Sequence, residues 1–484
     1  MKTVPGSSRS IPTNRAPGDR LRRMPCWPAT VCSGAAPDLS SPQPLSPTPF
    51  PSRPAMSPQL TLQTPLELPP ADVPAYLEQL WGQDQPSTGN AGAHTFCLLI
   101  WQPAWTEQQL IRTGRLSGPI TGVQRQELIA AAREAVIEVD LPLSTPPLSA
   151  AVAEALAGLA GDTTAEDLRG QHVDASVSSL RPRRLITLAP TLDAAQELET
   201  LVAAYCPLPE EGGGTAACGD VVVLRGGHDA LKRGLGILQP LLPEDLPSWV
   251  WWNGNLDEAP DLLRQLAIGP RRLIIDSALG DPLACLDLLA ARIDARLAVN
   301  DLNWLRLRSW RETLAMVFDP PHRRDALSHV VQLDLDVEGE HPVQGLLLAA
   351  WIADRLGWHL NGSQRNEDHG ISAEFQRPDG VAVQMRIAPV PMGAPSIHPG
   401  QIVGLRLISK PEAAPAMCVI LCAESGGCMR LEAGGMASME LLEEVVPVQN
   451  QPVEADVARL LEGGHDTTNP LLAAAAPLAA KLLS

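Results

Sequence analysis

The chain has 484 residues, which is enough for two or three domains with cores of their own. Its formal net charge of −18 argues against a nucleic-acid partner, because no basic face could dominate such a field. No apolar run reaches the roughly 18 residues that a membrane-spanning helix needs. Nine cysteines are too few for a disulfide scaffold of this size, so we expect a cytoplasmic protein with no membrane partner.

Residues 1–55 differ in composition from the rest of the chain. They are rich in Pro, Ser and Arg and show no apolar periodicity, so they cannot bury enough surface to order themselves. A basic, Ser-containing segment of this kind is typical of a transit peptide. The alternative is a start placed upstream of the true first residue, Met56. We expect a disordered or mis-called extension.

Residues 60–320 predict an α/β domain. Continuous Val, Ile and Leu runs predict buried strands at 94–103, 184–190, 219–227, 247–254 and 271–278. Amphipathic stretches predict helices at 71–81, 122–143, 191–205, 229–242, 256–267 and 280–297. Apolar strands that alternate with helices indicate a mostly parallel sheet covered on both faces. The expected fold is therefore a doubly wound, Rossmann-like sheet.

A helix over 301–319 ends this domain. Its apolar residues recur at helical spacing and form one stripe, with the arginines mostly off it. One interpretation is a core helix with a solvated basic face. The other is a contact surface for a partner, with exposed Trp and Arg as anchors, namely Trp304, Arg306, Arg308 and Trp310. The following Pro-Pro pair stops the helix, and we place a domain boundary there.

Residues 325–465 predict a smaller α+β domain with a mostly antiparallel sheet. Alternating strand patterns lie at 329–339, 370–390, 400–411, 417–424 and 428–435. The Arg-Pro-Asp-Gly sequence at 377–380 signals a hairpin turn. Helices are expected at 341–358 and 454–463. The apolar tail at 466–484 can either dock or fray.

The usual catalytic and cofactor motifs are missing from the sequence. There is no G-x-G-x-x-G after a strand, no P-loop, no G-x-S-x-G and no H-E-x-x-H. The Gly-rich turn at 226–227 could seat an anion, although an ordinary βα turn is the favoured interpretation. His322, His329 and His341 have no common zinc spacing. We therefore predict no catalytic residue, cofactor or metal.

The cysteine-rich stretch at 417–435 is the strongest local feature. An extended strand places Cys418 and Cys422 on one face, and Ser-Gly-Gly at 425–427 favours a turn before Cys428. A turn can bring Cys422 and Cys428 within the ~4.4–6.8 Å between Cα atoms that a disulfide needs. Closing so small a loop is worth only about 2 kcal/mol, which suits a switch rather than a staple. A redox switch and hairpin thiols that stay reduced both remain open, while zinc lacks a fourth ligand nearby.

Two other cysteines, Cys206 and Cys218, flank a Gly-rich loop and could approach each other. Buried thiols are the alternative for both. Cys97 and Cys285 lie in apolar strand and helix contexts and are interpreted as core residues.

Several long stretches resemble one family, the OpcA glucose-6-phosphate dehydrogenase assembly proteins in their photosynthetic-bacterial form. The resemblance covers about residues 60 to 465 and does not reach 1–55. Its clearest stretches are "RTGRLSGPITGVQRQELI", "RPRRLITLAPT", "AYCPLPEEGGGTAACGDVVVLRGG", "PSWVWWNGNLDEAP", "DLNWLRLRSWRETLAMVFDPPHRRDALSHVV" and "HPVQGLLLAAWIADRLGW".

This resemblance implies a non-enzymatic activator of glucose-6-phosphate dehydrogenase in the oxidative pentose phosphate pathway. It also implies a C-terminal cysteine pair that is oxidised in the activating form and reduced by thioredoxin. Cys422 and Cys428 match that pair by context and spacing. Cys418, Cys206 and Cys218 are left as additional thiols. The alternative function is an enzyme on a doubly wound sheet that acts on a phosphosugar.

Overall fold

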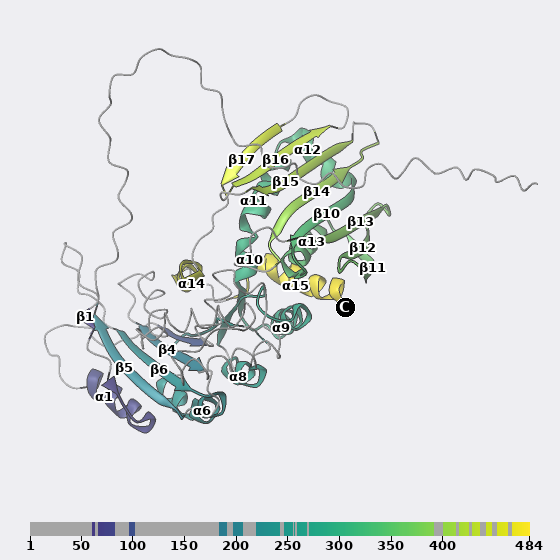
Figure 1. Ribbon diagram of the computed structural model, residues 1–484. Coiled ribbons are helices and arrows are strands. Elements are labelled where there is room, and N and C mark those ends of the chain that lie inside the picture. Colours follow the sequence, from purple (N-terminus) through teal and green to yellow (C-terminus); the bar gives the residue numbers. More distant parts are fainter. Residues whose placement is uncertain are drawn as a thin grey trace, which may run out of the picture. The chain divides into compact units, whose positions relative to one another are not determined.

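The computed structural model describes sixteen stretches of the chain, and the structural statements that follow concern these residues. They are 61–62, 66–82, 96–101, 183–190, 197–206, 219–242, 246–254, 256, 259–268, 271–391, 400–412, 416–424, 428–435, 442–447, 453–462 and 467–484. All belong to one compact unit, Pro51–Ser484, built from two sheets with helices packed against them (Figure 1). The expected extension at 1–55 and the expected helix at 122–143 lie outside the described residues.

The first sheet has nine strands in the order β1-β5-β6-β4-β3-β7-β8-β9, with β2 also pairing with β5. From β6 to β9 all neighbouring strands run parallel. Within this parallel part, the chain passes from the central strand β3 outward through β4 to β6, and then crosses to β7, β8 and β9 on the other side of β3. This is a doubly wound arrangement, so the predicted mostly parallel sheet is confirmed. The strands are β1 (Thr61–Leu62), β2 (Leu66–Glu67), β3 (Phe96–Trp101), β4 (Arg183–Pro190), β5 (Glu199–Cys206), β6 (Gly219–Gly226), β7 (Ser248–Trp252), β8 (Arg272–Ile275) and β9 (Val299–Asp301).

The predicted helix at 191–205 is wrong over its second half. Residues Glu199–Cys206 form β5, which runs antiparallel to β6 and pairs with β1 and β2 on its other edge. Thr200 and Val202 are buried while Leu201 is half-buried, an alternation of period two that suits a strand. Pairing on both edges outweighs the helical character of Glu, Leu and Ala in this segment, since propensity is a weak prior.

Helices cover both faces of the first sheet. One face packs against α1 (Val73–Gly82), α6 (His228–Gly234), α7 (Leu238–Leu241), α8 (Pro260–Leu266) and α9 (Pro282–Asp294). The other face packs against α14 (Val453–Glu462), whose Val457, Ala458, Leu460 and Leu461 join a cluster with apolar residues of β3, β4, β6, β7 and β8. A helix from near the end of the sequence therefore completes a sheet that begins hundreds of residues earlier.

The predicted helix at 301–319 is two helices, α10 (Leu302–Arg306) and α11 (Arg308–Phe318), which meet at Leu307. The predicted apolar stripe is buried as expected, from Trp304 through Leu307, Trp310 and Leu314 to Val317. After the Pro-Pro pair come two short elements, α12 (Pro321–Arg324) and η3 (Asp325–His329).

The second sheet has eight strands in the order β11-β12-β13-β10-β14-β15-β16-β17. Only β10 and β13 are parallel neighbours, which confirms a mostly antiparallel sheet. The predicted hairpin turn joins β12 to β13, and Gly380 there has a φ of +87° that favours glycine. The strands are β10 (Val330–Glu338), β11 (His359–Arg365), β12 (Ile371–Gln376), β13 (Ala382–Val390), β14 (Ile402–Ser409), β15 (Met417–Glu424), β16 (Cys428–Gly435) and β17 (Leu442–Pro447).

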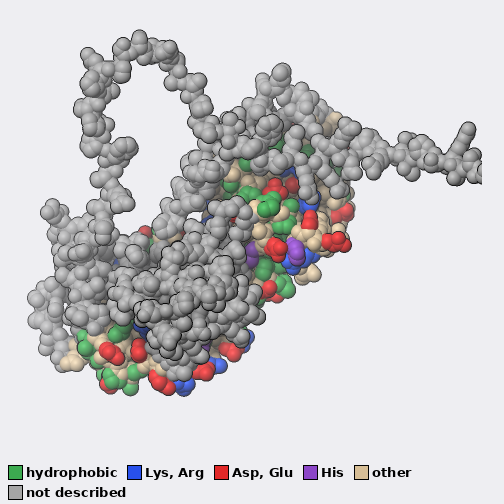
Figure 2. Space-filling model, viewed as in Figure 1, with side chains coloured by type: hydrophobic (Ala, Val, Ile, Leu, Met, Phe, Trp, Pro, Cys, Tyr) green, Lys and Arg blue, Asp and Glu red, His purple; other side chains and the backbone are tan. Residues whose placement is uncertain are grey.

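The two faces of the second sheet differ. Helix α13 (Val343–Arg355) packs against β10 and β13, and the apolar residues of the strands on that side, such as Leu335 and Leu421, are buried (Figure 1). The opposite face carries exposed or half-buried side chains, among them Glu374, Gln384 and Arg386. We call this second surface the open face. On the side of the molecule in Figure 2, acidic and basic side chains are interspersed over the described surface.

The C-terminal tail is docked. Residues Pro470–Leu483 form α15, which packs against both α9 and α13 (Figure 1). The hydroxyl of Thr468 accepts a hydrogen bond from the Val299 backbone N–H on β9, at 3.0 Å. The helices α14 and α15 thus connect the second half of the chain to the first sheet. The domain boundary near residues 320–325 stays a prediction.

Candidate functional site

The cysteine stretch forms an antiparallel pair of strands, β15 and β16. Cys418 is half-buried and Cys422 is 7% exposed. The register places Cys422 opposite Arg430, and places Cys428 opposite Glu424. The connecting residues 425–427, where we predicted a turn, lie outside the described residues.

The register sets the distance between Cys422 and Cys428 across the two strands. The two residues are offset by two positions along the strands, and such diagonal neighbours are about 7–8 Å apart. A disulfide needs Cα atoms within roughly 6.8 Å, so oxidation of this pair would require the backbone at the tip of the hairpin to move. The register alone therefore does not bring the two residues within bonding distance, and the disulfide between Cys422 and Cys428 stays a prediction.

Cys418 and Cys422 lie on the open face of the second sheet. On the neighbouring strand β14, Arg406 stands opposite Ile420, between Cys418 and Cys422. The guanidinium of Arg406 donates to a carboxylate oxygen of Asp334 on β10, at 2.9 Å from its Nε. Burial disfavours the charge on Arg406, but its contacts with Asp334 and the nearby Cys418 thiol leave its pKa raised.

A second group of residues lies where a doubly wound sheet usually binds ligands. The strand order reverses between β3 and β7, and ligands of such folds bind outside the carboxyl ends of the strands at that point. Here β3 and β7 both end in fully buried tryptophans, Trp101 and Trp252, whose rings stack 4.5 Å apart with planes 8° from parallel. His228, the first residue of α6, contacts Trp101 edge-on at 5.8 Å. The described ends of these strands thus combine aromatic packing with the half-buried side chain of His228 and the buried side chain of Asn253, which directly follows β7.

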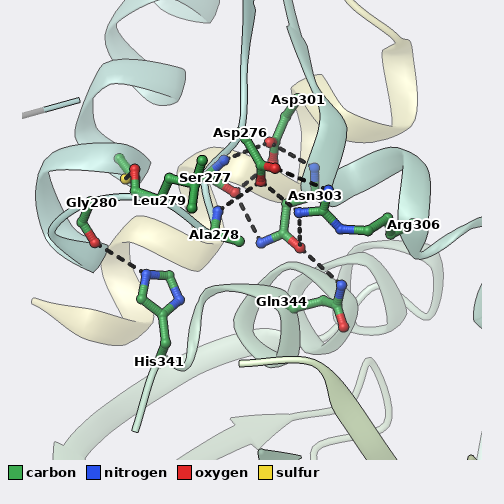
Figure 3. Close-up of polar contacts among 11 residues, drawn as sticks. Asp276, Ser277, Ala278, Leu279, Gly280, Asp301, Asn303, Arg306, His341 and Gln344 are labelled. Atoms are coloured by element: carbon green, nitrogen blue, oxygen red, sulfur yellow. Dashed lines mark hydrogen bonds and ion pairs between the residues drawn. The ribbon is translucent and has the colours of Figure 1, made fainter. Parts of the chain in front are cut away.

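A buried polar cluster lies at the carboxyl ends of β8 and β9 (Figure 3). Arg306 of α10 forms a two-pronged ion pair with Asp276, at 3.0 and 2.5 Å. Asp301 accepts hydrogen bonds from the backbone and hydroxyl of Ser277, at 3.0 and 2.8 Å, and caps α10 through the N–H of Asn303. The side chain of Asn303 accepts from Gln344 of α13, at 2.9 Å. The cluster therefore joins the first sheet to the helix that supports the second.

The charges in this cluster are unequal. The Arg306 guanidinium faces the carboxyls of Asp276 and Asp301, and it also acts on Asp456 of α14, which is ion-paired to Arg459 on the same helix. Burial, together with the charge of Asp276, raises the pKa of Asp301 to about 6. His341 is also buried, which lowers its pKa, and its Nε2 lies 3.2 Å from the carbonyl of Gly280. These groups are enclosed by packing, so we interpret the cluster as a structural junction.

The predicted partner-contact residues lie mostly inside the molecule. Trp304 and Trp310 are 1% and 3% exposed, and Arg311 covers the Trp304 ring at 3.8 Å. Arg306 is held by Asp276. Arg308 is exposed and pairs with Glu312 one turn away. These positions agree with the interpretation of 301–319 as part of the core. Of the four residues, only Arg308 has an exposed side chain available for a partner.

The remaining sequence candidates are dispersed. Cys206 ends β5, whereas Cys218 lies outside the described residues. Within the described ranges, no group of three or more His, Cys, Asp or Glu side chains could hold a metal ion. No helix among the described residues is long and apolar enough to cross a membrane.

Sequence reasoning missed four residues that shape these sites. Asp276 and Asp301 each come at the carboxyl end of a buried strand, a pattern visible in the sequence that we did not use. Asp336 and Gly404 lie in strands that were predicted, but their neighbours depend on which strands pair. Only the register of the sheet brings them beside the cysteines.

Comparison with known proteins gives the family. A family model described as the glucose-6-phosphate dehydrogenase subunit N-terminal domain matches residues 174–291, and one for its C-terminal domain matches residues 297–476. A protein of Synechococcus elongatus that carries the name OxPP cycle protein OpcA is 33% identical over 84% of this chain and 94% of its own length. The chain belongs to the OpcA family. Other members it resembles come from Nostoc punctiforme, at 31% identity over 82% of this chain and 89% of the relative, and from Synechocystis, at 30% over 84% and 90%.

Solved structures similar to this OpcA-family chain are distant. A 3-ketoreductase from Actinomadura kijaniata in complex with NADP and TDP-benzene matches 51% of this chain and 78% of its own, with 11% identity and a TM-score of 0.34. An aldose-aldose oxidoreductase from Caulobacter crescentus matches 54% and 79%, with 12% identity and a TM-score of 0.33. Likeness at this level carries no information on the activity of the chain.

Proposed function

We propose that this chain is a non-catalytic assembly factor that binds glucose-6-phosphate dehydrogenase and activates it allosterically. The observation that carries the proposal is membership of the OpcA family, whose two domain models are both described as parts of a glucose-6-phosphate dehydrogenase subunit. An activator of this kind works by binding the active state of the enzyme more tightly than the inactive state.

The described part of the first sheet supports a role other than catalysis. A nucleotide-dependent enzyme on this fold would use the crevice at the switch point, and the strands there end in the stacked pair Trp101 and Trp252. The acids at the ends of β8 and β9 are bound into a buried junction with Arg306. Neither group offers an accessible nucleophile or base.

We further propose that the activation is controlled by a disulfide between Cys422 and Cys428 that thioredoxin reduces. The position of Cys422 next to the hairpin tip, and the two-position offset from Cys428, support a bond whose formation reshapes the tip. The change would alter a docking surface on the second sheet and so the affinity for the active enzyme.

The test is a coupled assay of glucose-6-phosphate dehydrogenase. Added oxidised chain should raise the activity of the dehydrogenase, and prior treatment with reduced thioredoxin should remove most of that effect. The Cys422→Ser variant should give the same activation with and without thioredoxin. Cys285→Ser is the matched control, because Cys285 is a buried thiol on α9, which packs against the first sheet.

Two results would contradict parts of this proposal. Unchanged dehydrogenase activity with every form of the chain would remove the activator role. A thioredoxin response that persists in Cys422→Ser would leave the activator role in place and remove the cysteine pair. Turnover of a phosphosugar by the chain alone, without the dehydrogenase, would favour the enzyme alternative.

A further inference from the structure

Three residues from neighbouring strands of the second sheet form one row. Asp336 of β10 is the partner of Gly404 of β14, and Gly404 is in turn the partner of Cys422 of β15. Partners across antiparallel strands share a face, so the row lies on the open face. Two strand spacings separate Asp336 from Cys422, roughly 10 Å between backbones. The position between them has no side chain.

The missing side chain at Gly404 makes room for the carboxyl of Asp336. A Cβ at position 404 would lie 3.1 Å from Oδ2 of Asp336 and 3.5 Å from its Cβ. The carboxyl therefore occupies the space above Gly404, on the side of the aspartate that faces the strand of Cys422. An alanine at 404 would make a tighter contact than ordinary packing and push the carboxyl away.

Asp336 is an unusual acid on this face. Within the described part of the chain it forms no ion pair, because Arg406 is bonded to Asp334 and Arg386 to Asp368. Partial burial raises the pKa of Asp336, and the charge of Asp334 adds to this, while Arg406 and Arg386 oppose it. Along the row of Asp336 the register places the thiol of Cys422 on β15, beyond Gly404, and Glu338 follows two positions along β10 on the same face. Asp336 is therefore a carboxyl that can hold a proton close to a thiol.

We propose that Asp336 transfers the proton to and from Cys422 when the Cys422–Cys428 bond is broken or made, across the gap that Gly404 leaves. This inference rests on the disulfide proposed above. Burial makes Cys422 the sulfur that leaves, because an attacking thiolate has poor access to a side chain that is 7% exposed. A buried leaving thiolate needs a nearby proton, since its charge is costly away from water.

The steps balance with a dithiol as the reductant. A thiolate of the dithiol attacks the sulfur of Cys428, the bond between the two protein sulfurs breaks, and Cys422 leaves as a thiolate that takes the proton of Asp336. The second thiol of the reductant then attacks the mixed disulfide, which releases Cys428 and leaves the reductant oxidised. In the reverse direction the Asp336 carboxylate removes the proton from Cys422, and the resulting thiolate attacks the mixed disulfide at Cys428.

The first experiment measures the alkylation of Cys422 by iodoacetamide as a function of pH in the reduced full-length chain, with peptide mass spectrometry to resolve this cysteine from the others. Asp336→Asn should lower the midpoint of the profile by about one to two pH units, since it removes a neighbouring negative charge. Gly404→Ala should give a smaller change in the same direction. Glu374→Gln, an exposed acid on the same face and three strands from β14, is the control and should leave the midpoint unchanged.

The second experiment follows reduction of the disulfide by dithiothreitol, with the rate corrected for the thiolate fraction of the reagent. The wild-type rate constant should fall as the pH rises and Asp336 loses its proton, whereas the Asp336→Asn profile should be flat. At the lowest pH values, the disulfide of the wild type should be reduced about tenfold or more faster than that of Asp336→Asn, as expected for a general acid.

The outcomes separate the two proposals. If no disulfide forms, the proposed switch fails, and an alkylation midpoint that still moves in Asp336→Asn would keep the pairing of Asp336 with Cys422. If a disulfide forms and both profiles of Asp336→Asn match the wild type, the switch stands and the role of Asp336 is overturned. If Asp336→Asn shifts the alkylation midpoint of Cys422 but its reduction rate depends on pH as the wild-type rate does, proton transfer by Asp336 is also overturned.

Discussion

Acidic side chains occur at comparable places in the two sheets of this molecule, with different surroundings. In the first sheet, Asp276 and Asp301 follow β8 and β9 and are 4% and 1% exposed. In the second sheet, Asp334 and Asp336 lie on β10, half-buried on a face where Glu374 and Arg386 are exposed. The first pair is enclosed by α10, α13 and α14, and the second pair is partly open to solvent.

The difference follows from how each sheet is covered. A mostly parallel sheet needs helices on both faces, so polar groups at its strand ends must satisfy one another. A mostly antiparallel sheet can leave one face wet, and acids there keep access to protons and partners. We therefore expect the junction around Arg306 to stabilise the fold. We expect the row of Asp336, Gly404 and Cys422 to take part in the thiol chemistry.

The largest effect that tests this comparison is expected from Arg306→Ala. The variant leaves Asp276 without its ion-pair partner and removes the cation beside Asp301, and breaking a buried pair costs about 3–5 kcal/mol of the free energy of unfolding. Urea unfolding followed by circular dichroism measures this loss.

The control is Arg308→Ala, two residues along the chain. Its ion pair with Glu312 is exposed on both sides, and exposed pairs contribute about 0–1 kcal/mol. Equal losses of stability in the two variants would show that the junction contributes no more to stability than an exposed ion pair does. The stabilising role of the buried junction would then be overturned.

A smaller effect is expected from Asp301→Asn, and it depends on pH. The folded-state pKa of about 6 lies above the ordinary value of 3.8, so the contribution of Asp301 to stability is present at acid pH and is lost as the pH rises from about 4 to about 6. The amide keeps the acceptor for Ser277 and Asn303 and carries no charge. Relative to the wild type, the variant should thus gain on the order of 2–3 kcal/mol of unfolding free energy across this pH range and stay level above it.

Urea titrations at a series of pH values measure this gain. Asp319→Asn controls for the loss of one negative charge, because Asp319 is an exposed residue at the end of α11. A difference between Asp301→Asn and wild type that does not change with pH would mean that Asp301 keeps its charge at no cost.

The sequence predicted the type of both sheets, because continuous and alternating apolar runs report how many faces of a strand are buried. It did not predict β1, β2, β5, β9, β11 or β17. Strand β11 is polar and mostly exposed along its length, so its pairing with β12 leaves no apolar signal. The cysteine hairpin was visible as a local pattern. Its neighbours were not, because Asp336 is 86 residues from Cys422 along the chain and meets its row only through two strand pairings.

The smallest effect is expected on the open face, from Glu374→Ala. Glu374 is exposed, and its contacts with Asn361 and Gln384 are those of surface side chains, at 3.2 and 3.0 Å. We expect a change within about 0.5 kcal/mol in the free energy of unfolding, as for most surface substitutions. The next residue, Phe375, points to the other face and is fully buried, so Phe375→Ala should cost about 3–5 kcal/mol in the same urea titration. If Glu374→Ala instead costs several kcal/mol, the open face contributes to the stability of the fold as the junction does, and its acids could not be treated as groups available for chemistry.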